Sequence, residues 1–170
     1  LHLGPGLANG LASLHNARRA HSPVLNIVGE HASWHRQYDP PLATDIEALA
    51  GTLCGWRRTC LSAQSLARDT ADAVAAAMNG QVATMIVPFD YQLAACEDQD
   101  MLVPSLQKEP LDEQSIEAAV QALRSGKKAV LILGASGLGR DGQIAAARIK
   151  VKADCDLLAE TFPAHMHRGA

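Results

Sequence analysis

Apolar residues along this chain fall into two kinds of segment, spaced runs and short continuous runs. In the spaced runs they recur every three or four residues, which predicts helices at 7–20, 44–53, 62–80, 111–128 and 143–153. The continuous runs are typical of strands covered on both faces of a parallel sheet, and they predict strands at 1–3, 23–31, 81–90, 129–136 and 154–162.

Turn and capping residues mark the ends of these segments. The helix signals are Thr44 or Asp45, Ser62 or Ser65, and Asp112 at starts, with Asn79-Gly80 and Gly126 at ends. A β-α-β order with short joints indicates right-handed parallel crossovers. We therefore predict an α/β fold with doubly wound, parallel-sheet units of the flavodoxin or Rossmann-like kind.

The pattern breaks once, in the middle of the chain. Residues 96–110 are polar, contain two prolines and show no sustained period, so we interpret them as a linker. This predicts two partial domains, 1–97 and 111–170, joined by a linker at 98–110. The second has too few strands for a sheet covered on both faces, and the chain opens on Leu1 within a strand-like run. We therefore expect a fragment of a longer chain.

Composition narrows the class of protein. The chain has 48% hydrophobic residues and a net charge of −3, which favours a soluble α/β protein with no nucleic-acid partner. No apolar stretch approaches the ~20 residues of a membrane span, and no signal peptide is present, so we expect no membrane partner. The basic pairs are interpreted as solvated surface: Arg18-Arg19, Arg57-Arg58 and Lys127-Lys128.

Cysteine and histidine spacings give little support for a metal site. The four cysteines form no C-x-x-C pair, which favours free thiols in a reducing, cytoplasmic compartment. His31 and His35 have a spacing that would place both on one helix face, but no third ligand is evident. We interpret them as surface or site-rim residues, and His165 and His167 as structural or surface residues.

Gly4-Pro5-Gly6 stands where the first strand is expected to pass into the first helix. Glycines there allow the backbone to approach a ligand, and a helix N-terminus offers free N–H groups. The alternative is that the glycines only make a tight joint between the two elements.

A second glycine-rich turn supports a rival hypothesis. Residues 131–139 outline the strand, glycine turn and helix of a dinucleotide fold, with an acid about 20 residues on at Asp154 or Asp156. The glycines run G-x-x-G-x-G, which is not the expected G-x-G-x-x-G spacing. A nicotinamide-dependent oxidoreductase therefore stays an alternative, as does a non-catalytic binding module on this fold.

The order of segments resembles one enzyme family. Residues 4–31, "GPGLANGLASLHNARRAHSPVLNIVGEH", are similar to thiamine-diphosphate enzymes of the acetolactate synthase large-subunit type, where a G-P-G-x-x-N turn begins a helix and "SPV" opens the next strand. The likeness continues through "DIEALA" and "QVATMIVPFD". It resumes in "SIEAAVQALRSGKKAVLILGASGL", which resembles the start of that family's central domain.

The resemblance implies an enzyme, a lyase or transferase, acting on 2-oxo acids such as pyruvate. Residues 1–97 would be the pyrimidine-binding domain without its N-terminal part, and 111–170 the beginning of the central domain. Thiamine diphosphate is the implied cofactor, with Mg²⁺ held by a domain absent here and FAD in some members. Family members place the cofactor between subunits, which implies self-association as a dimer or tetramer.

The resemblance also assigns residues. Gly4, Pro5, Gly6 and Asn9 would contact the pyrimidine half of the cofactor. Substrate-side candidates are Glu30, where the family often has a glutamine, together with His31 and His35.

No catalytic residue and no metal ligand are expected within these 170 residues. The activating glutamate would precede Leu1. Arg140-Asp141-Gly142 echoes the family's G-D-G metal motif, but in the wrong domain. The chain alone is therefore predicted to be inactive.

Overall fold

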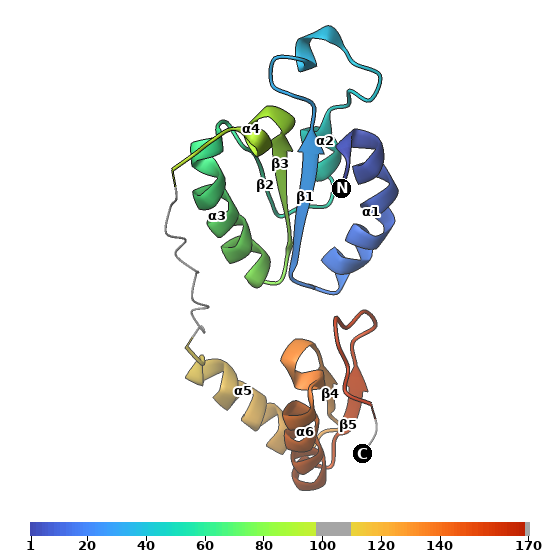
Figure 1. Ribbon diagram of the computed structural model, residues 1–170. Helices are drawn as coiled ribbons and strands as arrows, with labels where there is room; N and C mark the ends of the chain where they lie inside the picture. The colour runs from blue at the N-terminus through green and yellow to red at the C-terminus, as the bar shows by residue number, and fades with distance from the viewer. Residues whose placement is uncertain (98–109, 169–170) are drawn as a thin grey trace. The chain divides into compact units, whose positions relative to one another are not determined.

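The computed structural model describes residues 1–97 and 110–168. The chain forms two compact units, Leu1–Leu106 and Gln107–Ala170 (Figure 1). The linker predicted at 98–110 lies outside the described residues except for Pro110. Each unit is an alternation of helices and parallel strands, and each is described by itself below.

The first unit is built on a three-stranded parallel sheet in the order β1-β3-β2. Its strands are β1 (Val24–Glu30), β2 (Trp56–Thr59) and β3 (Val82–Pro88). Its helices are α1 (Leu3–Arg19), α2 (Ile46–Gly51), α3 (Leu66–Met78) and the short α4 (Phe89–Leu93), with 3₁₀ turns η1 (Arg36–Tyr38) and η2 (Ala63–Ser65).

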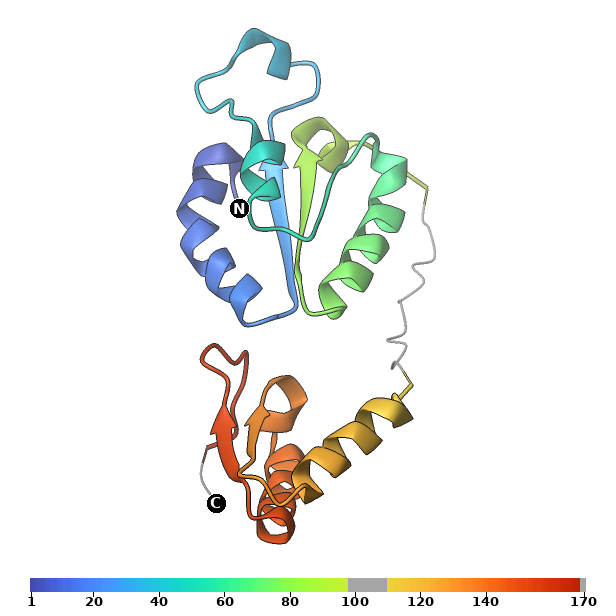
Figure 2. The same cartoon turned by 180° about the vertical axis from the view of Figure 1, so that it is seen from behind.

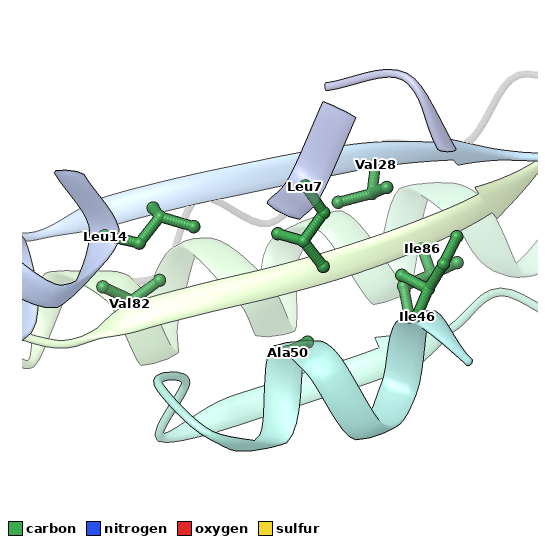
Figure 3. Packing of buried hydrophobic residues seen from close by; sticks show 7 residues of the cluster. All are labelled: Leu7, Leu14, Val28, Ile46, Ala50, Val82 and Ile86. Carbon is green, nitrogen blue, oxygen red and sulfur yellow. The ribbon is translucent and has the colours of Figure 1, made fainter. Parts of the chain in front are cut away.

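Helices cover both faces of this sheet, as Figures 1 and 2 show. On one face, Val82 and Ile86 of β3 pack with Leu7 and Leu14 of α1 and with residues of α2 (Figure 3). On the other face, Ala83 packs with the alanines of α3. Every residue of β3 is buried, which explains why its sequence is apolar except for Thr84. The predicted doubly wound α/β fold is confirmed.

The start of the chain differs in detail from the prediction. His2 forms a parallel bridge with Gly29, and the Gly29 N–H donates to the Leu1 carbonyl at 2.9 Å, so the expected strand is a single bridge. Helix α1 already begins at Leu3. Gly4-Pro5-Gly6 therefore lies in the first turn of the helix, and the prediction of a turn between strand and helix is wrong.

Two short elements of the first unit, β2 and α4, were not predicted from the sequence. β2 has four residues and contains two arginines, so it offers no continuous apolar run. The interpretation of Arg58 as solvated surface is also wrong. Its guanidinium pairs with Asp69 at 2.8 Å and Asp72 at 2.6 Å, and it lies over the Trp56 ring.

The second unit contains a two-stranded parallel sheet of β4 (Val130–Leu133) and β5 (Asp156–Ala159). Helices α5 (Glu113–Arg124) and α6 (Arg140–Ala153) and the 3₁₀ turn η3 (Ala135–Leu138) complete it. The Asp112 carboxylate caps α5, as predicted. Within the described part of the chain, no helix has the length and apolar character that crossing a membrane requires.

Candidate functional site

The predicted site residues of the first unit gather at the carboxyl ends of its strands. β1 ends at Glu30, and α1 begins beside it because His2 bridges Gly29. Open parallel α/β sheets bind their ligands at this edge, because the loops and helix N-termini that follow the strands meet there. The structure therefore brings the start of α1 and the loop after β1 to the place where a ligand is expected.

Backbone geometry at the start of α1 is unusual. Leu3 is buried and has a φ of 56°, in the left-handed region. A bulky residue in that region carries about 1–2 kcal/mol of strain. Such strain persists only when the surrounding structure fixes it, and it is concentrated at ligand-binding sites.

The two glycines of the first turn serve different purposes. A Cβ on Gly4 would stand 2.2 Å from the Cβ of Thr44, so glycine is required there by the loop packed against α1. A Cβ on Gly6 would have its nearest neighbour at 3.6 Å, an ordinary contact. The need for glycine at position 4 therefore arises within the protein rather than from a ligand.

Pro5 and Asn9 present exposed side chains in the first turns of α1. Proline suits the first turn of a helix because the N–H groups there have no partner within the helix. Asn9 makes no side-chain hydrogen bond with any residue in the described ranges. Both side chains are therefore free to contact a ligand, one with an apolar ring and the other with an amide.

Glu30 is a buried carboxylate, with 5% of its surface exposed. Its Oε1 accepts a hydrogen bond from the His31 N–H at 2.7 Å, and its Oε2 lies 3.9 Å from Nε of Arg36. With Arg36, Glu47 and Thr59 it lines a cavity of about 400 Å³. An ionised carboxylate only accepts hydrogen bonds, whereas an amide both donates and accepts. When ionised, Glu30 can therefore accept a hydrogen bond from a ligand in this cavity, and Arg36 can donate one.

The loop after β1 carries an aromatic cluster. The rings of His31 and His35 meet edge to face at 5.5 Å, and His35 stacks on Trp34 at 5.4 Å. The Nε2 atom of His31 is buried without a hydrogen-bond partner in the described structure. The two histidines lie in a loop, not on a helix, so the helix-face geometry that their spacing suggested is absent.

The same loop is tied to α4 by one side chain. The N–H and hydroxyl of Ser33 donate to the two carboxylate oxygens of Asp90, at 2.9 and 2.6 Å. These hydrogen bonds lower the pKa of Asp90. Across the described ranges, no three His, Cys, Asp or Glu side chains come together as a metal site would require.

The glycine-rich turn of the second unit has a packing role. A Cβ on Gly142 would lie 2.5 Å from the Gly137 carbonyl oxygen, so the first turn of α6 must approach η3 closely. Arg140-Asp141-Gly142 lies in that first helical turn. The Ala135 N–H donates a hydrogen bond to the Glu160 carboxylate at 3.0 Å. The turn that suggested dinucleotide binding is thus occupied by contacts within the unit.

Sequence comparison supports one family. The profile described as "Thiamine pyrophosphate enzyme, N-terminal TPP binding domain" matches residues 1–49. A protein of Mycobacterium tuberculosis (strain ATCC 25618 / H37Rv), named "Putative acetolactate synthase large subunit IlvX", is 42% identical over 172 residues, covering 100% of this chain and 33% of the relative. The chain thus spans about a third of the length of that relative.

Solved structures show the same fold. The Rhodococcus jostii RHA1 thiamine diphosphate-dependent 4-hydroxybenzoylformate decarboxylase superposes with a TM-score of 0.82 at 21% identity, covering 96% of this chain and 32% of its own. Benzoylformate decarboxylase from Polynucleobacter necessarius superposes with a TM-score of 0.78 at 18% identity, covering 93% of this chain and 30% of its own.

The fold is a parallel α/β fold, and its candidate site lies at the carboxyl ends of the strands. The profile match and the 42% identity support membership of the thiamine-diphosphate-dependent enzyme family, and the chain is similar to a part of an acetolactate synthase large subunit. These matches do not favour a nicotinamide-dependent oxidoreductase.

Proposed function

We propose that this protein binds the pyrimidine half of thiamine diphosphate at the start of α1. The observation that carries the proposal is the left-handed Leu3, which begins α1 beside the end of β1 and leaves Pro5 and Asn9 exposed in the first turns of that helix. The profile match to residues 1–49 covers all three of these positions and supports the same assignment.

The residues at this edge fit an aminopyrimidine ring. Such a ring has an apolar face and a polar rim, which Pro5 and Asn9 can contact with a pyrrolidine ring and a primary amide. Gly6 lies between them in the same turn and has no side chain that would stand between the backbone and a ligand. The bound cofactor supplies an electron sink for breaking the bond beside a carbonyl group.

For the whole enzyme we propose decarboxylation and carboligation of 2-oxo acids such as pyruvate. Arg36 is about half exposed, and its Nε lies 3.9 Å from the Glu30 carboxylate, which is too far for a hydrogen bond. The N–H groups of its guanidinium therefore stay available for a substrate carboxylate. Glu30 would accept a hydrogen bond from the substrate side, with His31 and His35 at the rim.

The family resemblance adds further proposals. The additional cofactors are Mg²⁺ and, in some members, FAD. The whole enzyme would associate as a dimer or tetramer, and its location would be the cytoplasm. The resemblance also assigns the activating glutamate and the metal motif to sequence outside these 170 residues. We therefore propose that the chain alone consumes no pyruvate.

An NMR titration tests the binding step directly. The ¹⁵N-labelled chain is titrated with 4-amino-5-hydroxymethyl-2-methylpyrimidine, the alcohol of the cofactor's pyrimidine half. We expect shifts at the Gly6 amide and the Asn9 side-chain amide, with binding weakened about tenfold in Asn9→Ala. Asn16→Ala, an exposed asparagine farther along α1, is the matched control and should bind like the parent chain.

Two results would oppose the proposal. One is equal weakening by Asn9→Ala and Asn16→Ala, and the other is a titration in which the Gly6 amide does not move. Pyruvate consumption by this chain with thiamine diphosphate and Mg²⁺, measured separately, would contradict the expected inactivity without affecting the binding proposal.

A further inference from the structure

We infer that the first unit has a second binding site, for a phosphate-bearing small molecule, at the amino-terminal edge of its sheet. A cavity of about 470 Å³ lies there, where α1 ends and β3 begins. Its lining includes Arg18, Arg19 and His21, with the loop after α2 and residues Gly80–Val82 forming the remaining walls. We refer to it as the basic cavity. It lies at the opposite end of the strands from Glu30, so it is separate from the candidate site above.

Positive charge gathers at the basic cavity without acidic residues in its lining. Arg18 and Arg19 are two sources of this charge, and Arg57 is a third. The guanidinium of Arg57 packs over Gly51 of the lining, so that a Cβ added to this glycine would lie 3.2 Å from Cζ of Arg57. Burial raises the pKa of Cys54 in the cavity wall, and the charge of Arg57 acts against this rise. Three arginines therefore act on one cavity.

These arginines lack the carboxylate partners that Arg36 and Arg58 have. Residues 1–97 contain six arginines and no lysine. Arg36 and Arg58 pair with carboxylates. In the described ranges, no carboxylate lies within 4.0 Å of the three arginines at the basic cavity, and Arg18 only donates to the Thr52 carbonyl at 3.3 Å.

The C-termini of three helices offset part of this positive charge. α1, α2 and α3 all end at this edge, and each C-terminus carries about half a negative charge. That is about half of the charge that three guanidinium groups supply, so the cavity stays positive. Carbonyl groups also cannot replace a carboxylate or phosphate, whose paired oxygens match the guanidinium fork.

The size of the basic cavity indicates what kind of anion it takes. Sites for small molecules have volumes of about 300–1,000 Å³, and the basic cavity is within that range at about 470 Å³. A free phosphate ion would leave most of that space empty. We therefore assign it a phosphate group carried on a larger body, such as a phosphorylated metabolite or a nucleotide.

Glycine amides provide a direct test of the location. The ¹⁵N-labelled chain is titrated with inorganic pyrophosphate and, separately, with ADP, at low ionic strength and without divalent cations. We expect shifts at Gly51, Gly55 and Gly80, which line the basic cavity, while Gly4 and Gly6 at the other edge stay in place.

Arginine variants then test the chemistry. Arg18→Gln and Arg19→Gln should each weaken binding about tenfold, because each removes a charge-assisted contact. Arg68→Gln is the matched control, since Arg68 is exposed in α3 and does not line the cavity. Its affinity should equal that of the parent chain.

The outcomes separate the proposal from its alternatives. Equal affinity for pyrophosphate and ADP supports recognition of the phosphate alone, and tighter ADP binding supports a nucleotide. If Arg68→Gln weakened binding as much as Arg18→Gln and Arg19→Gln do, the binding would depend only on the overall charge of the protein, and the proposal would be overturned. Shifts at Gly6 in place of Gly80 would also overturn it. Absence of binding, with Arg18→Gln lowering only the melting temperature, would show that the arginines do no more than neutralise helix ends.

Discussion

Replacing Gly4 by alanine tests whether packing against Thr44 is the reason for that glycine. The added Cβ would stand 2.2 Å from Thr44 Cβ, far inside van der Waals contact. Overpacking of this kind costs about 1–3 kcal/mol, and a clash between two Cβ atoms belongs at the upper end. Alanine regains up to about 1 kcal/mol of helix propensity. We expect Gly4→Ala to lower the free energy of unfolding by about 2 kcal/mol.

Gly6→Ala is the matched control. It lies in the same helical turn, gains the same propensity, and meets its nearest neighbour at 3.6 Å. We expect it to leave stability unchanged or raise it by up to about 1 kcal/mol. The two variants should therefore differ by about 2–3 kcal/mol, which is about 10 °C or more in melting temperature for a unit of this size.

Urea unfolding followed by tryptophan fluorescence measures this difference. The only two tryptophans of the sequence, Trp34 and Trp56, both belong to the first unit, so the signal reports on that unit. A second alanine variant is made in a Thr44→Gly background, where the clashing side chain is gone. There Gly4→Ala should no longer destabilise. Equal stabilities of Gly4→Ala and Gly6→Ala in the parent background would refute the packing argument.

Three further predictions follow from individual side chains. Burial acts to raise the pKa of Asp69, but hydrogen bonds from Ser65 and Arg58 outweigh it and lower that pKa. Its contribution to stability is therefore complete above about pH 4 and is lost as the pH falls below that value, so Asp69→Asn should flatten the acid limb of a stability–pH curve. Asp90→Asn should speed proteolytic cleavage in the 31–39 loop, measured by mass spectrometry, because Ser33 loses its carboxylate partner; an unchanged rate would oppose this reasoning. Burial raises the pKa of Cys60 to about 12, so iodoacetamide at pH 8 should label the exposed Cys96 while Cys60 stays unmodified.

The long elements could be predicted because their signals are local. β3 is buried on both faces and its sequence is apolar except for Thr84, while α3 shows a helical period and a closing Asn79-Gly80. β2 could not be predicted because its place in the sheet depends on pairing with β3, and because Arg58 is stabilised by Asp69 and Asp72 of α3. A strand of four residues carries no pattern of its own that would show this.

The candidate site was predictable only in part. The glycine-proline turn and Glu30 stand out in the sequence, but their surroundings depend on long-range contacts. Ser33 and Asp90 are 57 positions apart, so no local pattern could pair them. The approach of Thr44 to Gly4 is likewise a property of the folded chain. Sequence alone therefore left open whether Gly4 served a ligand or the protein.

The strand order β1-β3-β2 has a consequence for how the first unit forms during synthesis. β3 is the central strand of the described sheet, yet it is the last of the three to leave the ribosome, and β1 and β2 do not pair with each other. Until residue 88 has emerged, β1 and β2 lack the strand that joins them. The apolar residues of α1 and α2 that pack against β3 therefore stay without this partner until β3 has been made, and they are exposed to chaperones and to aggregation during that interval.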